Sequence, residues 1–302
     1  MKIRINNKEF DVERNEILED VVKKHFKEKD IVAARIDGKL CDLSEIIVEN
    51  SDIELVSTAD KTGLDVMRHT CAHVFGHAIK QIYPDVQMVI GPVIENGFYY
   101  DILSSVPISE KELNLIENRM RKLAKKNYSI VREVVTKDEA ISIFNARNEP
   151  YKVELLKEIP KNEVIAVYHH EEYIDMCRGP HLTNTRHIKA FKLMKISGSY
   201  WKGNSENQAL TRIYGTAWPS VDSQDEYIKS LEEAEKRDHR ILGKKLDLFH
   251  FQEESPGMVF WHNKGWTIFN LIKDFITDYL RENSYEIINT PQILDKSLWK
   301  KS

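Results

Sequence analysis

Residues 68–80 read RHTCAHVFGHAIK and place histidines at positions 69, 73 and 77. In an α-helix a four-residue step turns the side chain by only about 40°, so His69, His73 and His77 share one stripe of a helix predicted over residues 63–82. Two imidazoles at i and i+4 are also the helical half of many zinc sites. The alternative is a helix whose polar face is rich in histidine, and this stretch alone leaves both interpretations open.

A second group of ligand-type residues follows about 100 positions later, in DMCRGPH. Asp175, Cys177 and His181 belong to it, and the Arg-Gly-Pro inside it predicts a loop. Placed opposite the histidine helix, this loop would complete a cluster of His69, His73, Cys177 and His181. Three interpretations stay open: a zinc site, a hydrolytic site in which imidazoles handle water, and unrelated polar residues.

Two hydrolase classes fit poorly. A zincin protease needs His-Glu-x-x-His, and here Thr70 follows His69, so that class is excluded. A cysteine protease would use Cys177 as nucleophile, but nothing local indicates a triad or an oxyanion loop. Four protein ligands would also saturate tetrahedral zinc, so metal binding and hydrolysis by all four residues are in tension.

The composition and length are typical of a soluble cytosolic protein with two domains or more. The 302 residues are 41% hydrophobic and 30% charged, and they contain no apolar run of about 18 residues that would span a membrane. The N-terminus, MKIRINNKEFDVE, lacks the apolar core of a signal peptide. Cys41, Cys71 and Cys177 are too few and too scattered for a disulfide framework, so we expect reduced thiols.

The net charge of −4 is unevenly distributed. Residues 61–220 carry 22 basic and 18 acidic side chains and seven of the 11 histidines, whereas the flanking segments are acidic. Phosphates of a nucleic acid would therefore be bound by the middle of the chain. A surplus of four charges is modest, and an ordinary solvated surface explains it nearly as well.

The hydrophobic periodicity predicts several structural units. Residues 1–57 alternate apolar and polar residues around one short helix, which predicts a ubiquitin-like ββαβ roll. Turn signals predict a hairpin within residues 87–103. Residues 222–245 read as one charged amphipathic helix, and an apolar helix over 264–283 leads into a strand that closes at Pro291. Further helices are predicted over 109–127, 137–147 and 151–158, and strands over 163–175.

These motifs together resemble a known family. RHTCAHVFGHAIKQIYPDVQMVIGPVIENGFYYDI, YIDMCRGPHL and FKLMKISGSYWKGNSENQALTRIYGTAW closely resemble the editing domain of bacterial-type threonyl-tRNA synthetases. The stretch LDLFHFQEESPGMVFWHNKGWTIFNLI resembles the start of their class II catalytic domain through motif 1, with Pro291 at the motif's proline. The resemblance implies a multidomain α+β chain, with a β-grasp TGS domain at 1–60, an editing domain at 61–221, a linker helix at 222–242, and an incomplete class II antiparallel-sheet domain at 243–302.

The resemblance also implies site residues. His69, His73, Cys177 and His181 match the editing core, Lys152 and Asp175 match positions that assist water, substrate or product, and Gly91 and Tyr100 match the pocket. His77 lies outside the matching pair, and we expect it to pack within the helix. Alanine-type editing domains bind metal with a similar set, so zinc at the four core residues stays open beside a metal-free water mechanism, which we favour.

The implied activity is hydrolysis of serine from tRNA(Thr). Serine lacks only one methyl of threonine, a difference of about 1–3 kcal/mol that a synthetic site cannot exploit sufficiently, so a second site must remove the error. We expect acceptor-arm phosphates to meet basic residues of the middle segment: Arg119, Arg121, Lys122, Lys125, Lys126, Arg186, Lys189 and Lys192. A non-catalytic tRNA-binding or regulatory module is the alternative.

The remaining expectations concern the rest of such an enzyme. Threonine, ATP, magnesium and one zinc belong to the catalytic half, whose motifs 2 and 3 we expect beyond Ser302, so the chain reads as the N-terminal portion of a synthetase. Motif 1 builds class II dimers, which predicts a homodimer when that domain is complete.

Overall fold

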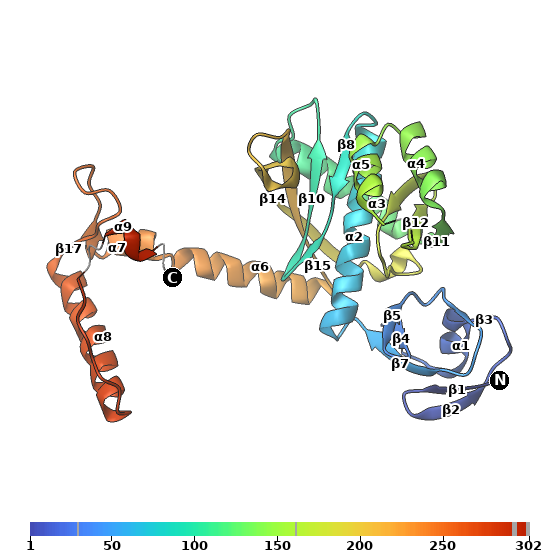
Figure 1. Cartoon of the computed structure of the whole chain (residues 1–302), viewed down its shortest axis with the longest axis horizontal. Helices are drawn as coiled ribbons and strands as arrows, with labels where there is room; N and C mark the ends of the chain where they lie inside the picture. The colour runs from blue at the N-terminus through green and yellow to red at the C-terminus, as the bar shows by residue number, and fades with distance from the viewer. Residues whose placement is uncertain (29, 161, 292–294, 300–302) are drawn as a thin grey trace. The chain divides into compact units, whose positions relative to one another are not determined.

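The computed structural model describes residues 1–28, 30–160, 162–291 and 295–299, and they divide into two compact units, 1–226 and 227–302. Both contain helices and strands, so the chain is a mixed α+β protein as predicted (Figure 1). None of the described helices combines the length and the apolar character that a bilayer crossing demands. Three residues at each of 292–294 and 300–302, within the predicted class II segment, lie outside the described residues.

The N-terminal part of the first unit is a five-stranded sheet packed on one helix. Asn6 and Asn7 both have positive φ, at 46° and 66°, which suits the tight turn of the first hairpin. Strand order is β2-β1-β7-β4-β5, with β1 and β7 parallel and the other pairs antiparallel. The elements are β1 (Lys2–Ile5), β2 (Lys8–Asp11), β3 (Glu16–Ile17), α1 (Leu18–His25), β4 (Ile31–Ile36), β5 (Lys39–Cys41), β6 (Ile46–Ile47) and β7 (Asp52–Ser57). A separate apolar cluster, including Ile5, Leu18 and Ile53, forms its core.

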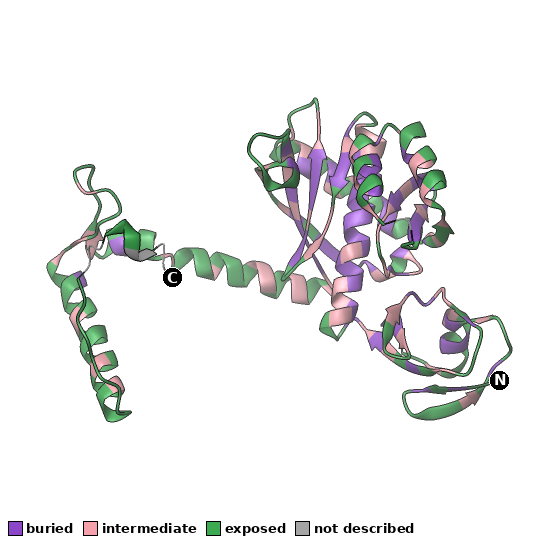
Figure 2. Cartoon of the chain, in the orientation of Figure 1, coloured by how far each residue is buried: buried purple, intermediate pink, exposed green. Residues whose placement is uncertain are grey.

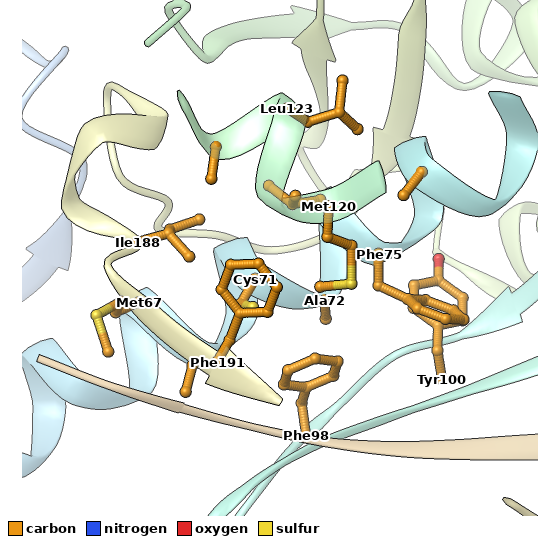
Figure 3. Packing of buried hydrophobic residues seen from close by; sticks show 14 of the residues in the cluster. Met67, Cys71, Ala72, Phe75, Phe98, Tyr100, Met120, Leu123, Ile188 and Phe191 are labelled. Carbon is orange, nitrogen blue, oxygen red and sulfur yellow. The ribbon is translucent and has the colours of Figure 1, made fainter. Parts of the chain in front are cut away.

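Helix α2 (Lys61–Ile82) is the centre of the first unit. It begins two residues before the predicted start and ends at the predicted residue 82, just before Tyr83 and Pro84. Almost every residue from Val66 to Ile79 is buried, because the helix is covered on all sides (Figure 2). Figure 3 shows Cys71 and Phe75 of this helix packed with Phe98, Met120 and Phe191 from other elements.

Two antiparallel sheets and helix α3 pack on α2, while α4 and α5 pack on each other and on these sheets. The larger sheet has the order β14-β15-β10-β8 with β9 beside β10, and the smaller has the order β11-β12-β13. The predicted hairpin within 87–103 is therefore present. The strands are β8 (Gln87–Ile90), β9 (Val93–Ile94), β10 (Gly97–Leu103), β11 (Val131–Val135), β12 (Ile165–His170), β13 (Tyr173–Met176), β14 (Ala190–Tyr200) and β15 (Ala209–Trp218); the helices are α3 (Glu110–Lys126), α4 (Lys137–Ala146) and α5 (Pro150–Glu158).

The prediction of one helix over residues 222–245 is wrong. It is two helices, α6 (Val221–Lys236) and α7 (His239–Lys245), separated at Arg237 and Asp238. The Asp238 carboxylate accepts a hydrogen bond from the Arg240 backbone N–H at 2.7 Å, so it caps a new helix instead of continuing the old one.

The second unit also contains β16 (Phe249–His250), β17 (Phe260–Trp261), α8 (Asn263–Glu282) and α9 (Lys296–Trp299). β16 and β17 pair with each other. The strand predicted to close at Pro291 is wrong, because described residues 284–291 have no neighbouring strand with which to pair. Among the described residues of this unit only Gly243 and Gly265 are buried, so it has little core of its own.

Candidate active site

The histidine stripe of α2 contributes two residues to a site and one to packing. The rings of His69 and His73 lie 5.2 Å apart, edge to face. His77, one turn further, is bound elsewhere: its Nδ1 lies 2.9 Å from the Tyr128 hydroxyl and its Nε2 lies 2.8 Å from a Glu172 carboxylate oxygen. The structure therefore places His77 outside the cluster, in agreement with expectation.

The loop after β13 brings the second half of the cluster to α2. The His181 ring lies 4.1 Å from that of His73 and 4.3 Å from that of His69, between centroids. Cys177 Sγ is 2.9 Å from His181 Nε2. One ligand atom from each of His69, His73, Cys177 and His181 lies within 4.8 Å of the others, so the four predicted residues form one cluster.

A buried ion pair adjoins this cluster. Lys152 Nζ lies 2.6 Å from Asp175 Oδ1, and Asp175 Oδ2 accepts hydrogen bonds from the hydroxyls of Tyr100 at 2.6 Å and Tyr173 at 2.8 Å. The same carboxylate oxygen is 3.8 Å from His73 Nε2. Burial alone would raise the pKa of Asp175, but the Lys152 charge and these hydrogen bonds lower it, so the carboxylate is ionised.

Burial sets the protonation state of the histidines. It lowers the pKa of His69 to about 4 and that of His170 to about 3, and it holds the pKa values of His73 and His181 well below 6.5. At neutral pH the cluster is therefore a set of neutral imidazoles, which can accept protons or bind a metal. Burial also raises the pKa of the Cys177 thiol, so the sulfur is a protonated donor and not a reactive thiolate.

The His181 tautomer follows from its neighbours. Thr70 Oγ1 lies 2.9 Å from the Val66 carbonyl, to which it donates, and 3.0 Å from His181 Nδ1. With its hydrogen directed to that carbonyl, the threonine oxygen accepts from His181 Nδ1–H. His181 Nε2 then carries a lone pair, which accepts from the Cys177 thiol.

The donor set fits a metal ion as well as it fits water chemistry. Three neutral imidazoles and one thiol, close together and with Thr70 orienting one imidazole from behind, are a suitable set for tetrahedral zinc. His69, His73, Cys177 and His181 would hold it.

The two predicted pocket residues contact each other. A Cβ at Gly91 would lie 2.5 Å from the Tyr100 ring, so only glycine allows the chain this close to the ring. Tyr100 is fully buried, and its hydroxyl also accepts from Lys152 Nζ at 3.0 Å. Gly91 thus allows the Tyr100 ring its position, and the Tyr100 hydroxyl bonds both Lys152 and Asp175.

The predicted phosphate-binding residues differ in availability. Arg121 is bound to Glu117 at 2.7 Å and stacks on Phe191, and Arg119 donates to Gln81. Lys126 lies 3.6 Å from Glu171. The exposed members are Lys122, Lys125, Lys126, Arg186, Lys189 and Lys192.

Sequence reasoning missed several residues that touch the cluster. In the sequence, Thr70 is notable only because it stands where a zincin would have glutamate, and nothing there indicates that it contacts His181. His170 ends β12 with its ring 5.4 Å from that of His73, and the His-His pair in a strand followed by DMCRGPH was a usable signal. Asp42 accepts from the His181 backbone N–H at 2.6 Å, but nothing in its local sequence indicates this.

Comparison with known proteins agrees with the motifs. Residues 165–214 match the family model described as the threonyl and alanyl tRNA synthetase second additional domain, a segment that includes Cys177 and His181.

Whole-chain relatives extend the match. The threonine–tRNA ligase of Psychrobacter arcticus is 51% identical over 274 residues, which is 91% of this chain and 42% of that protein. The ligase of Prochlorococcus marinus is 52% identical over 271 residues, or 90% of this chain and 42% of that protein. The ligase of Psychrobacter cryohalolentis is 50% identical over 274 residues, which is 91% of this chain and 42% of that protein. The chain thus spans about two-fifths of the length of these relatives. Over nine-tenths of its own length, this chain is related to the threonine–tRNA ligases, the family to which its motifs pointed.

Proposed function

We propose that this chain hydrolyses mischarged seryl-tRNA(Thr), as the editing part of a threonine–tRNA ligase. The observation that carries the proposal is the buried cluster of neutral imidazoles and one thiol beside the Lys152–Asp175 pair. The neutral imidazoles keep a nitrogen lone pair free to accept a proton from water, which is what cleavage of an aminoacyl ester needs.

Each residue has a role in this proposal. His73 takes a proton from the attacking water; its Nδ1 is buried without a hydrogen-bond partner among the described residues, and its Nε2 faces Asp175. The water oxygen adds to the ester carbonyl, the bond to the ribose oxygen breaks, and the proton passes to that ribose oxygen. Lys152 supplies positive charge to the developing negative oxygen.

His69 and Cys177 are the two partly exposed members of the cluster, so they are the ones placed to contact the seryl group. Cys177 lines the site as a protonated thiol and is not the nucleophile, because burial keeps it from ionising. We favour a water mechanism without metal. Zinc, when bound by the four cluster residues, would instead polarise the ester or hold the cluster together.

Deacylation of tRNA(Thr) charged in parallel with serine and with threonine tests the proposal. We expect rapid loss of serine only, abolished by His73→Ala and retained by His77→Ala, a matched change one turn along the same helix. Binding of tRNA without hydrolysis by the unchanged chain would instead favour a non-catalytic tRNA-binding or regulatory module. A chelator arm, with metal analysis of the protein, separates the two mechanisms: loss of activity with the chelator would assign the cluster to zinc.

Threonine ligation is the activity that the names of the relatives record. We propose that this chain serves an enzyme of that activity, which joins threonine to tRNA with ATP and magnesium, and a zinc in its catalytic site. We also propose that α8 pairs with a second copy, as the resemblance to motif 1 implies. Its apolar face is exposed, with Phe275 72% accessible, and a hollow of 400 Å³ lies along Ile268, Phe269, Ile272 and Ile276.

A further inference from the structure

Asp42 connects the N-terminal sheet to the histidine cluster. It follows β5, in the segment before the site's own elements begin, and it is a carboxylate with only 5% of its surface exposed. Carboxylates are rarely buried this far unless their oxygens are fully used. Both oxygens are used here, and both of their hydrogen-bond donors come from the wall of the candidate active site.

The two donors are one backbone group and one side chain. The His181 backbone N–H donates to Oδ1 at 2.6 Å, and the Tyr168 hydroxyl donates to Oδ2 at 3.0 Å. The Tyr168 ring in turn lies 4.3 Å from the His181 ring, between centroids. One carboxylate therefore fixes the backbone of His181 and the aromatic ring that packs against its imidazole.

Cys177 depends on the same anchor. Its Sγ contacts His181 Nε2, and the hollow that Cys177 lines is also lined by Leu40, Cys41 and Asp42 of the N-terminal part. Asp42 also faces Arg132, whose Nε is 3.8 Å away and whose Nη1 lies 3.5 Å from Glu45. Glu45 thus shares this arginine with Asp42, but its side chain is 41% exposed, so it is a natural comparison.

From this geometry we infer that Asp42 is a positioning residue of the hydrolytic site, through which residues 1–60 take part in hydrolysis. The inference rests on the proposed function for its catalytic meaning. Without the carboxylate, the His181 N–H and the Tyr168 hydroxyl lose their acceptor, and the Cys177–His181 loop can move away from α2. The N-terminal part is then a structural component of the site and not only an appended module.

The first test is kinetic, on the full chain with seryl-tRNA(Thr). We expect Asp42→Ala to lower kcat about 10–100-fold, the range for residues that orient a reacting group from behind, with KM changed less than about threefold. Asp42→Asn keeps an acceptor for the His181 N–H and should remain near wild type, as should Glu45→Gln. A loss confined to KM, or equal losses in Asp42→Ala and Glu45→Gln, would overturn the inference.

The second test does not need hydrolysis. Iodoacetamide alkylation of each cysteine is followed by mass spectrometry, with fully buried Cys71 as the internal reporter of global unfolding. We expect Asp42→Ala to raise the rate at Cys177 about tenfold or more while Cys71 stays protected, because only the loop opens. An unchanged Cys177 rate in Asp42→Ala would overturn the inference even if the chain proved inactive, so failure of the proposed function and failure of this inference are separable.

A third variant covers loss of folding. Should Asp42→Ala expose Cys71 as well, Asp42→Glu decides the matter, since it keeps the charge but displaces both oxygens by one methylene. A folded Asp42→Glu with a lower kcat and a faster Cys177 supports positioning. A folded Asp42→Glu that is wild type in both measurements contradicts it.

Discussion

Asp175 is a carboxylate with almost no contact with water, and its charge depends on the few groups that surround it. Lys152 supplies the compensating charge, and Tyr100 and Tyr173 supply hydrogen bonds. A buried pair of this kind contributes little net stability, but removing one partner leaves an uncompensated charge. Substitution of Lys152 or Asp175 alone is therefore expected to be the most damaging change in the site.

Lys152→Met should destabilise the first unit by about 3 kcal/mol or more, because Asp175 would stay buried without its cation. For a unit of this size that corresponds to a fall of about 6–12 °C in Tm. Differential scanning calorimetry measures it. Lys157→Met, at an exposed lysine of the same helix, is the matched control and should change Tm by less than about 1 °C. Equal effects of the two substitutions would contradict the buried-pair account.

The histidines make stability depend on pH. In the folded chain burial lowers the pKa of His170 to about 3, whereas the unfolded chain keeps about 6.5. Below pH 6.5 the unfolded state binds the proton and the folded state does not, so the free energy of unfolding falls as pH falls from 6.5 toward 3. This one histidine accounts for roughly 2 kcal/mol of loss by pH 5.

His170→Gln removes that titration, so the loss of stability between pH 7 and pH 5 should be smaller than in the unchanged chain. Urea unfolding midpoints at the two pH values measure the difference. His25→Gln, in the N-terminal helix, is the control. An identical pH dependence in His170→Gln and the unchanged chain would show that folding does not lower the pKa of His170.

Elements explain which parts of the structure were predictable. The helix of residues 61–82 was predicted within two residues, because its four-residue histidine spacing and the Pro84 that follows are local signals. The cluster of His69, His73, Cys177 and His181 was predicted because both halves carry recognisable spacing. The break at Asp238 and the absence of a strand before Pro291 were not, since a cap competing with a helix and a missing strand partner are decided by three-dimensional neighbours.

The same limit applies within the site. Asp42 and Thr70 contact the backbone or imidazole of His181, which is far away in the sequence, and neither belongs to a spacing that predicts this contact. His170 could have been found from the His-His pair that ends its strand shortly before DMCRGPH. The predicted roles of individual residues, by contrast, stay predictions, because proximity does not establish chemistry.

The turn between β8 and β10 makes an element-scale prediction. Gly91→Ala would place a methyl 2.5 Å from the Tyr100 ring, and that ring cannot move without disturbing Asp175. We expect a loss of about 1–3 kcal/mol in the free energy of unfolding and a slower hydrolysis. Gly198→Ala is the control, because its Cβ would meet open space. Equal behaviour of the two variants would show that the turn accommodates the methyl.

Helix α8 gives a second prediction at the element scale. If its apolar face pairs with a second copy, Ile272→Lys should weaken self-association at least about tenfold, because a charge would be buried in an apolar contact. Asp274→Lys adds a lysine on the opposite side of the helix and should leave association unchanged. Sedimentation equilibrium across a range of concentrations measures both. A monomer at every concentration would refute the pairing.

At the scale of the whole molecule, electrostatics decides how tRNA would bind. Exposed lysines of two segments, Lys122 and Lys125 on α3 and Lys189 and Lys192 near β14, belong to the basic middle of an otherwise acidic chain. Arg186 and Lys189 also line a hollow of 410 Å³ together with Lys23 and Lys27. Binding of phosphates by these side chains releases counterions, so tRNA affinity would weaken steeply with salt.

Replacing Lys189 and Lys192 with glutamine should reduce the slope of log K against log salt by about one for each phosphate that the variant no longer binds. Filter binding of tRNA(Thr) from 50 to 300 mM salt, about the range over which such effects are large, measures the slope. Lys229→Gln, on α6, is the control. An unchanged slope would remove these lysines from the interface.

The separation between Asp42 and His181 has a consequence for synthesis of the chain. The two residues are 139 positions apart, and the ion pair and imidazoles near them come from α2, α5, β12 and β13 between them. A ribosome that has translated only the histidine helix has produced no site at all. The cluster is complete only when the loop around His181 has emerged, and the sheet that packs on α2 is complete only when β14 and β15, later still in the chain, have been added.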